Sequence, residues 1–127
     1  MTDAPESRLA FPRAMRLSGE RAFAAVFEAR CRKNAGPLAV SGRPNELRHN
    51  RLGLSVSRRL GGAVERNRIK RRLREAFRLS QHQQPAGYDI VIVVRPHKLL
   101  SVEAYQQHLL KAFGEIDALW QKRRPRK

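Results

Sequence analysis

The segment VERNRIKRRLREAFR, residues 64–78, joins dense positive charge to a regular apolar pattern. Its apolar side chains are Ile69, Leu73, Ala76 and Phe77, and its outward basic ones are Lys70, Arg71, Arg74 and Arg78. At roughly 100° per residue the two groups fall on opposite sides of a helix. The pattern therefore predicts a helix from about 64 to 79 that packs on a sheet and turns its basic face outward. Arg66, near the apolar edge, is expected to act from the first turn.

Two runs before this helix and one after it have the patterns of strands. RLGLSVS (51–57) alternates leucine or valine with small or polar residues, as a half-buried strand does. LAVSGR (38–43) is a second candidate, and the two runs are close enough along the chain to form a hairpin. YDIVIVV (88–94) is almost continuously apolar, which predicts a strand covered on both faces.

Two further helices flank these elements. The helical spacing of apolar residues predicts one over about 19–29, with Ser18 as its N-cap. Ser101 is expected to cap the other, whose apolar stripe runs from Val102 to Trp120. The basic end of the chain, QKRRPRK (121–127), is expected to be disordered.

The order helix, two strands, helix, strand, helix predicts an α+β fold. We expect a single-domain α/β sandwich in which three helices pack on one small central sheet. The expected divisions are an N-terminal arm over 1–16, a folded domain over 17–120 and a disordered tail over 121–127.

The charge of the chain points to a polyanionic partner. The 127 residues include 27 Lys and Arg against 11 Asp and Glu, a formal charge of 27 − 11 = +16. So much like charge in a small domain repels itself unless a polyanion neutralises it, and nucleic acid is the first candidate. Arginine dominates residues 64–78, and its planar fork pairs with phosphate oxygens. A membrane surface ranks last, because this segment has few bulky apolar residues and lies between strands.

The expected location is the cytoplasm. The N-terminus has acidic residues early and lacks the apolar region of a secretory signal. No apolar run approaches the roughly 18 residues of a transmembrane helix. Cys31 has no second cysteine with which to form an intrachain disulfide.

No pattern of a catalytic centre is visible. The four histidines are His49, His82, His97 and His108, and none stands at metal-ligand spacing from another histidine or from a cysteine. Phosphate-binding glycine loops, G-x-S-x-G and paired carboxylates on one predicted face are also missing. Ser55 and Ser57 have no adjacent base. The chain is therefore equipped to bind RNA or DNA rather than to catalyse.

The string RNRIKRRLREAFR, residues 66–78, resembles the protein subunit of bacterial ribonuclease P. That family has an R-N-R tripeptide followed by a spaced Lys-Arg pair and a further Arg. These positions are here Arg66, Asn67, Arg68, Lys70, Arg71 and Arg74. The upstream run RLGLSVSRRLGGAVERNR, LAFPRAMRL near the start and FAAVF in the first helix also fit the family. The resemblance extends from about Leu9 to Trp120.

The resemblance implies an accessory subunit of an endoribonuclease whose catalyst is a large RNA. The reaction is hydrolytic removal of the 5′ leader from precursor tRNA, with Mg²⁺ held mainly by the RNA and none bound by the protein alone. The domain over 17–120 would bind RNA, with the R-N-R helix facing the catalytic RNA. A cleft between the first helix and the sheet would hold the leader through Phe23, Phe27, Ser55, Ser57, Arg58 and Arg59. No catalytic residue, membrane contact or obligate protein partner is expected.

Two structural features accompany the resemblance. Some family members carry an aromatic residue on the first strand of the cleft, where this sequence has Leu38-Ala39-Val40. The family also has a left-handed strand–helix–strand crossover, although about 98% of such crossovers are right-handed. We therefore expect a left-handed crossover around the helix at 64–79.

Two other classes of protein stay open. A ribosomal protein or another RNA-binding structural module would share the small basic α+β architecture but would need no cleft, so leader-dependent binding to precursor tRNA separates it. A DNA-binding regulator would place the basic helix in a major groove. No helix-turn-helix spacing is visible, and competition with duplex DNA tests that class.

Overall fold

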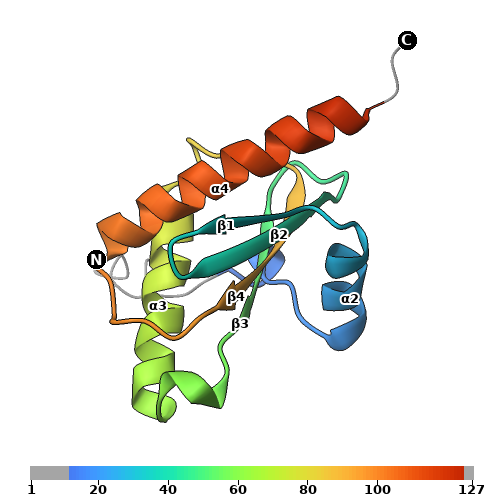
Figure 1. Ribbon diagram of the computed structural model, residues 1–127. Helices are drawn as coiled ribbons and strands as arrows, with labels where there is room; N and C mark the ends of the chain where they lie inside the picture. Colours follow the sequence, from blue (N-terminus) through green and yellow to red (C-terminus); the bar gives the residue numbers. More distant parts are fainter. Residues whose placement is uncertain (1–11, 125–127) are drawn as a thin grey trace, which may run out of the picture.

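Four strands form one mixed sheet in the computed structural model, which describes residues 12–124 (Figure 1). They are β1 (Arg32–Ala35), β2 (Leu38–Pro44), β3 (Arg51–Ser55) and β4 (Tyr88–Val94), in the spatial order β1-β2-β4-β3. β2 runs antiparallel to both of its neighbours, and β3 runs parallel to β4. Every residue of β4 except Val93 is buried, as its continuous apolar run predicted.

Helices cover both faces of this sheet. They are α2 (Glu20–Glu28), α3 (Ala63–Leu79) and α4 (Val102–Arg123), with short 3-10 helices η1 (Arg13–Met15) and η2 (Arg58–Leu60). The apolar residues of α3 and α4 share the main core with one face of the sheet, whereas α2 packs on the other face in a smaller cluster around Leu17, Val26 and Val91. Figure 1 shows α2 apart from the α3–α4 pair, across the sheet. The predicted α+β architecture with three helices is confirmed.

The predicted hairpin between residues 38–43 and 51–57 was wrong. β4 lies between β2 and β3 and pairs with both of them. The physical reason is burial, because the apolar run of β4 is covered on both faces only at the centre of the sheet. The partner of β2 in a hairpin is instead β1, whose polar sequence RKNA has no apolar alternation to reveal it.

The connection β3–α3–β4 joins two parallel, neighbouring strands through a helix. It is thus a crossover unit of the kind that the resemblance implies. Its left-handed sense stays a prediction.

Two predicted boundaries need correction. Gly19, not Ser18, is the N-cap of α2, and its φ of 97° is a conformation that glycine adopts at little cost. α4 continues to Arg123, so the expected disordered tail is wrong for residues 121–123, where Arg123 donates hydrogen bonds to the preceding part of the fold. The cap at Ser101 is confirmed, since its Oγ accepts a hydrogen bond from Ala104 N at 3.1 Å.

The rest of the predicted arm and tail, residues 1–11 and 125–127, lies outside the described residues. The division of the chain at 16 and 120 otherwise stays a prediction. No helix within residues 12–124 is both long and apolar enough to cross a membrane.

Candidate nucleic-acid interface

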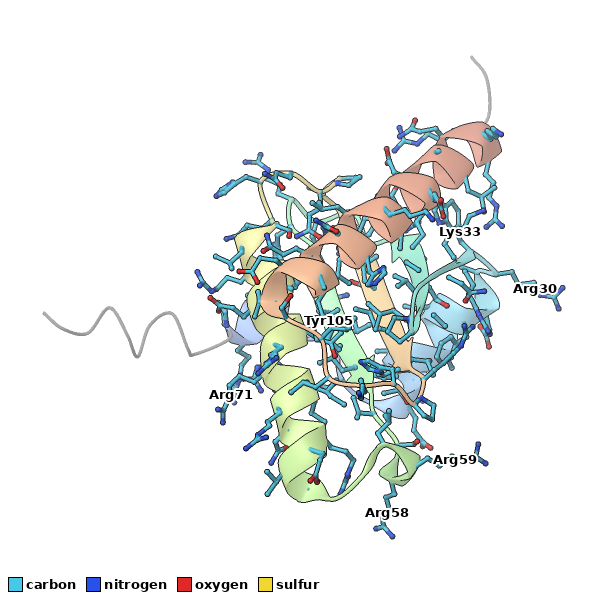
Figure 2. The ribbon with its side chains drawn as sticks, turned by 60° about the vertical axis from the view of Figure 1, so that its left-hand side comes forward. Arg30, Lys33, Arg58, Arg59, Arg71 and Tyr105 are labelled. Atoms are coloured by element: carbon cyan, nitrogen blue, oxygen red, sulfur yellow. The ribbon has the colours of Figure 1, made fainter. Side chains whose placement is uncertain are left out.

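The helix α3 has the apolar face that its sequence predicted, but of the four basic residues expected on its outer face only Arg71 is exposed, and Lys70, Arg74 and Arg78 are half-buried. Ile69, Leu73, Ala76 and Phe77 are buried. Of the family-pattern residues, Asn67, Arg68 and Arg71 are exposed, and Arg66, Lys70 and Arg74 are half-buried. Figure 2 shows Arg71 extending from α3 away from the body of the protein. The apolar stripe therefore holds the helix in place and leaves a basic surface to solvent.

Some cations of α3 already have partners within the protein. Arg72 Nη1 donates to the Leu100 carbonyl oxygen at 2.8 Å. Arg78 forms an ion pair with Glu75 at 2.7 Å, one turn away on the same helix. These two arginines therefore serve the fold. Arg66 of the family pattern also has a partner, since its Nε donates to the Gly61 carbonyl oxygen at 3.3 Å.

Positive charge is crowded at the middle of α3. Burial lowers the pKa of Arg74, and the nearby guanidinium of Arg16 lowers it further. A bound anion offsets the desolvation of such a half-buried cation and its repulsion by the neighbouring like charge. Arg16 itself forms an isolated parallel bridge with Leu52 of β3, which holds this part of the predicted N-terminal arm against the sheet.

A second surface lies on the opposite side of the sheet, along α2. An open hollow of about 500 Å³ is lined by Gly19, Glu20, Phe23, Ala24 and Phe27. Phe23 is half-buried, whereas Phe27 is 44% exposed. Both aromatic rings that the sequence assigned to the cleft therefore border this hollow.

The register of the strands shows which residues share this face of the sheet. Gly53 faces α2, because a Cβ built on it would meet the ring of Phe23. Alternate residues of a strand share a face, so Ser55 also lies on the α2 side of β3. Ser55 is paired with Val93, Val93 with Ala39, and Ala39 with Asn34. This row of four residues, none of them aromatic, crosses the sheet on the side of α2.

The remaining predicted cleft residues follow the end of β3. Ser57, Arg58 and Arg59 are all exposed, and the two arginines belong to η2. In Figure 2 Arg59 extends to the same side of the molecule as Arg30, opposite to Arg71. Of the predicted cleft residues, only Phe23 and Phe27 line the hollow, whereas Arg58 and Arg59 belong to η2, which contacts α3.

Asn34, at the β1 end of the row that crosses the sheet, and its partner Arg95 were not among the residues predicted from the sequence. Arg95 Nη2 donates to Asn34 Oδ1 at 2.8 Å, and both residues are exposed. The signal was missing because Asn34 lies in β1, a polar strand without an alternating pattern. Among residues 12–124, no three His, Cys, Asp or Glu side chains gather in a way that could hold a metal ion.

Comparison with known proteins places this chain in a family. Residues 11–117 match the family model described as Ribonuclease P. A ribonuclease P protein component from Photorhabdus laumondii is 46% identical over 89 residues, which cover 69% of this chain and 74% of that protein.

Solved structures agree with this match. The RNase P protein from Thermotoga maritima, in complex with 1-(4-fluorophenyl)-2-thiourea, is similar with a TM-score of 0.70 and 33% identity, over 77% of this chain and 96% of that one. The RNase P protein from Staphylococcus aureus gives a TM-score of 0.68 and 31% identity, over 83% of this chain and 96% of that one.

Proposed function

The chain belongs to the ribonuclease P protein family, and we propose that it binds two RNAs at once. α3 would hold the catalytic RNA of the ribonucleoprotein, and the hollow along α2 would hold the 5′ leader of precursor tRNA. The observation that carries this proposal is that the basic outer face of α3 and the aromatic hollow along α2 lie on opposite sides of the sheet. Two RNA segments can then contact one small domain without competing for the same side chains.

The contact with the catalytic RNA would use Arg66, Asn67, Arg68, Lys70, Arg71 and Arg74. Exposure of Arg68 and Arg71, and the crowded charge at Arg74, support this assignment. Guanidinium groups on a rigid helix pair with phosphate oxygens without the entropy loss of ordering a flexible segment.

The leader would lie in the hollow with its phosphates near Ser55, Ser57, Arg58 and Arg59. Phe27 offers an exposed ring on which an unpaired base can stack, with Phe23 beside it. Stacking and phosphate contacts carry little sequence information, so leaders of many sequences would be accepted. Mature tRNA has no leader and would bind more weakly, so the protein would discriminate substrate from product. Its tolerance of many leader sequences would broaden the substrate range.

Cleavage of the phosphodiester bond would be carried out by the RNA in the cytoplasm. Magnesium ions would supply the activated water, and they would be held mainly by the RNA. The described residues contain no ligand set that fits such an ion, so no step is assigned to this chain. The protein would instead raise the affinity of the RNA for its substrate, with no obligate protein partner.

Cleavage of a precursor tRNA at low magnesium tests this proposal. The reaction is run with the cognate catalytic RNA alone, with RNA plus protein, and with protein alone. Activity that appears only when both components are present is the expected result. Unchanged activity of the RNA would contradict the proposal and favour the ribosomal alternative, and cleavage by the protein alone would place a catalytic site in this chain.

Salt dependence gives a second readout of the same proposal. The logarithm of leader affinity is expected to fall with the logarithm of salt concentration, with a slope of about −0.7 per neutralised phosphate. An affinity for leader RNA that does not depend on salt would contradict the proposed phosphate contacts.

A further inference from the structure

The helix α2 is a short element that its own sequence stabilises poorly. It has nine residues, whereas isolated helices shorter than about 12–15 residues are marginal in water. Among the described residues, no side chain caps its N-terminus, and its last turn contains no basic residue. Glu28 even places a negative charge at the C-terminal end, where the helix dipole disfavours it. The position of α2 therefore depends on contacts with other elements.

Arg123, at the end of α4, supplies the missing C-terminal partner. Its Nη1 donates to the Ala29 carbonyl oxygen and its Nη2 donates to the Arg30 carbonyl oxygen, both at 2.8 Å. These carbonyls close the C-terminal end of α2, and a cation there also complements the helix dipole. A residue 94 positions away along the chain thus performs the function of a local cap.

Trp120 holds Arg123 in this position. The guanidinium carbon of Arg123 lies 4.8 Å from the centroid of the Trp120 ring, a cation–π contact. Trp120 Nε1 in turn donates to the Gly42 carbonyl oxygen of β2 at 2.9 Å. We call Trp120 and Arg123 the α4 brace, because together they connect β2 to the end of α2. Figure 1 shows the C-terminal end of α4 reaching past the sheet on the side of α2.

The brace acts on a strained point of the backbone. Arg30 has a φ of 54°, a left-handed conformation that is unfavourable for a residue with a side chain. Its carbonyl oxygen is one of the two that Arg123 binds. The backbone turn that ends α2 and begins β1 is thus stabilised in part from α4, while the Arg30 side chain extends into solvent (Figure 2).

We propose that Arg123 and Trp120 are positioning residues for leader binding. By fixing the C-terminal end of α2 against β2, they hold Phe27 and the hollow beside it in the geometry that accepts a single strand. This inference rests on the proposed function of the hollow. Both residues lie beyond 117, the last residue that the family model matches, so they extend the site past the family pattern. Neither residue needs to touch RNA.

The test compares holoenzymes assembled from the catalytic RNA and Arg123→Met, Arg123→Lys or Trp120→Phe protein. KM and kcat are measured on a precursor with a long leader and on one with a single-nucleotide leader. For Arg123→Met we expect KM of the long-leader precursor to rise about tenfold, since two hydrogen bonds from a charged group are lost. This variant should keep its kcat, its affinity for the catalytic RNA and its KM for the short-leader precursor unchanged. Trp120→Phe should show a smaller change of the same kind, and Arg123→Lys should recover part of the loss.

Lys122→Met is the matched control, because it removes one positive charge from the same turn of α4. It is expected to change the KM of both precursors by less than about twofold, as generic charge loss would. If Arg123→Met and Lys122→Met behave alike on the long-leader precursor, the brace has no positioning role. If the wild-type holoenzyme fails to distinguish the two precursors, the proposed function of the hollow is itself wrong. These failures are distinguishable because only the second appears without any substitution.

Discussion

The ring of Phe23 lies directly above Gly53, in the space that a side chain on this residue of β3 would occupy. A Cβ added at Gly53 would come within 2.5 Å of Phe23 Cε1 and 2.9 Å of the Leu17 carbonyl oxygen. The ring can move, but the backbone oxygen cannot give way without shifting the chain that enters α2. The distance between α2 and the sheet, and the position of the Phe23 ring that lines the hollow, therefore depend on this glycine.

Gly53→Ala should weaken both the fold and the proposed leader binding. Overpacking of this kind costs about 1–3 kcal/mol of unfolding free energy, measured by urea denaturation. Displacement of Phe23 should also lower leader affinity, measured by titration with a fluorescent single-stranded RNA. Gly114→Ala is the control, since Gly114 lies exposed in α4 with no atom within 4 Å of an added Cβ. That variant should gain about 0.5–1 kcal/mol, and equal effects of both substitutions would contradict the close packing.

Phe27→Ala should reduce leader affinity about tenfold while leaving stability almost unchanged, because the exposed ring contributes little to the core. Leader binding and urea denaturation measured on the same protein separate the two effects. Leu47→Ala is a matched control, since Leu47 is 42% exposed and lies in the loop after β2. An equal loss in both variants would indicate a general apolar effect rather than stacking.

Arg68→Ala should weaken binding to the catalytic RNA and reduce the salt slope of that binding by about one. The melting temperature should not change, because Arg68 is exposed on α3. Arg78→Ala is the comparison on the same helix, where the charge is paired with Glu75. A smaller loss is expected there, and a larger one would place the RNA at the C-terminal end of α3.

Stability should fall in alkaline solution. Burial raises the pKa of Tyr88, and the hydrogen bond that its hydroxyl donates to Asp117 at 2.7 Å raises it further. The unfolded chain loses this proton at about pH 10 while the folded protein keeps it. The stabilisation is therefore complete below about pH 10 and is lost as pH rises further.

The measurement is the unfolding free energy of wild type and Tyr88→Phe from about pH 9 to about pH 11. Above the tyrosine pKa, the wild-type curve should fall more steeply, by at most about 1.4 kcal/mol per pH unit for one group. Lysine deprotonation affects both proteins alike, so the difference isolates Tyr88. Parallel curves would show that its ionisation is not linked to folding.

Local patterns predicted the elements whose burial follows a regular pattern within one segment of the sequence. The apolar spacing of Ile69, Leu73 and Phe77 predicted α3 almost to its observed ends, and the run at 88–94 predicted a strand buried on both faces. These signals are strong because burial imposes a period on nearby residues of the same element. The residues of the R-N-R pattern were identified by family resemblance, and the helical period correctly placed Arg71 on the outer face.

Features that depend on distant residues could not be predicted in this way. The polar sequence of β1 becomes a strand only because β2 offers it a hydrogen-bonding edge. The predicted pairing of neighbouring runs was wrong because the position of β4 is decided by coverage from helices on both faces. The contact of Arg123 with Ala29 joins residues far apart in the chain, and no periodic pattern in the sequence predicts it.

The central place of β4 also has a consequence for biosynthesis. β4 is the last strand to be synthesised, yet β3 pairs with no other strand in the described sheet, and β2 and β3 are joined only through it. A nascent chain that stops before residue 88 therefore has the β1–β2 hairpin but lacks the strand that joins it to β3, so the sheet on which α3 docks is incomplete. The core that fixes α3 exists in full only once β4 and α4 have been synthesised, which makes the fixed basic face of α3 a late feature of folding.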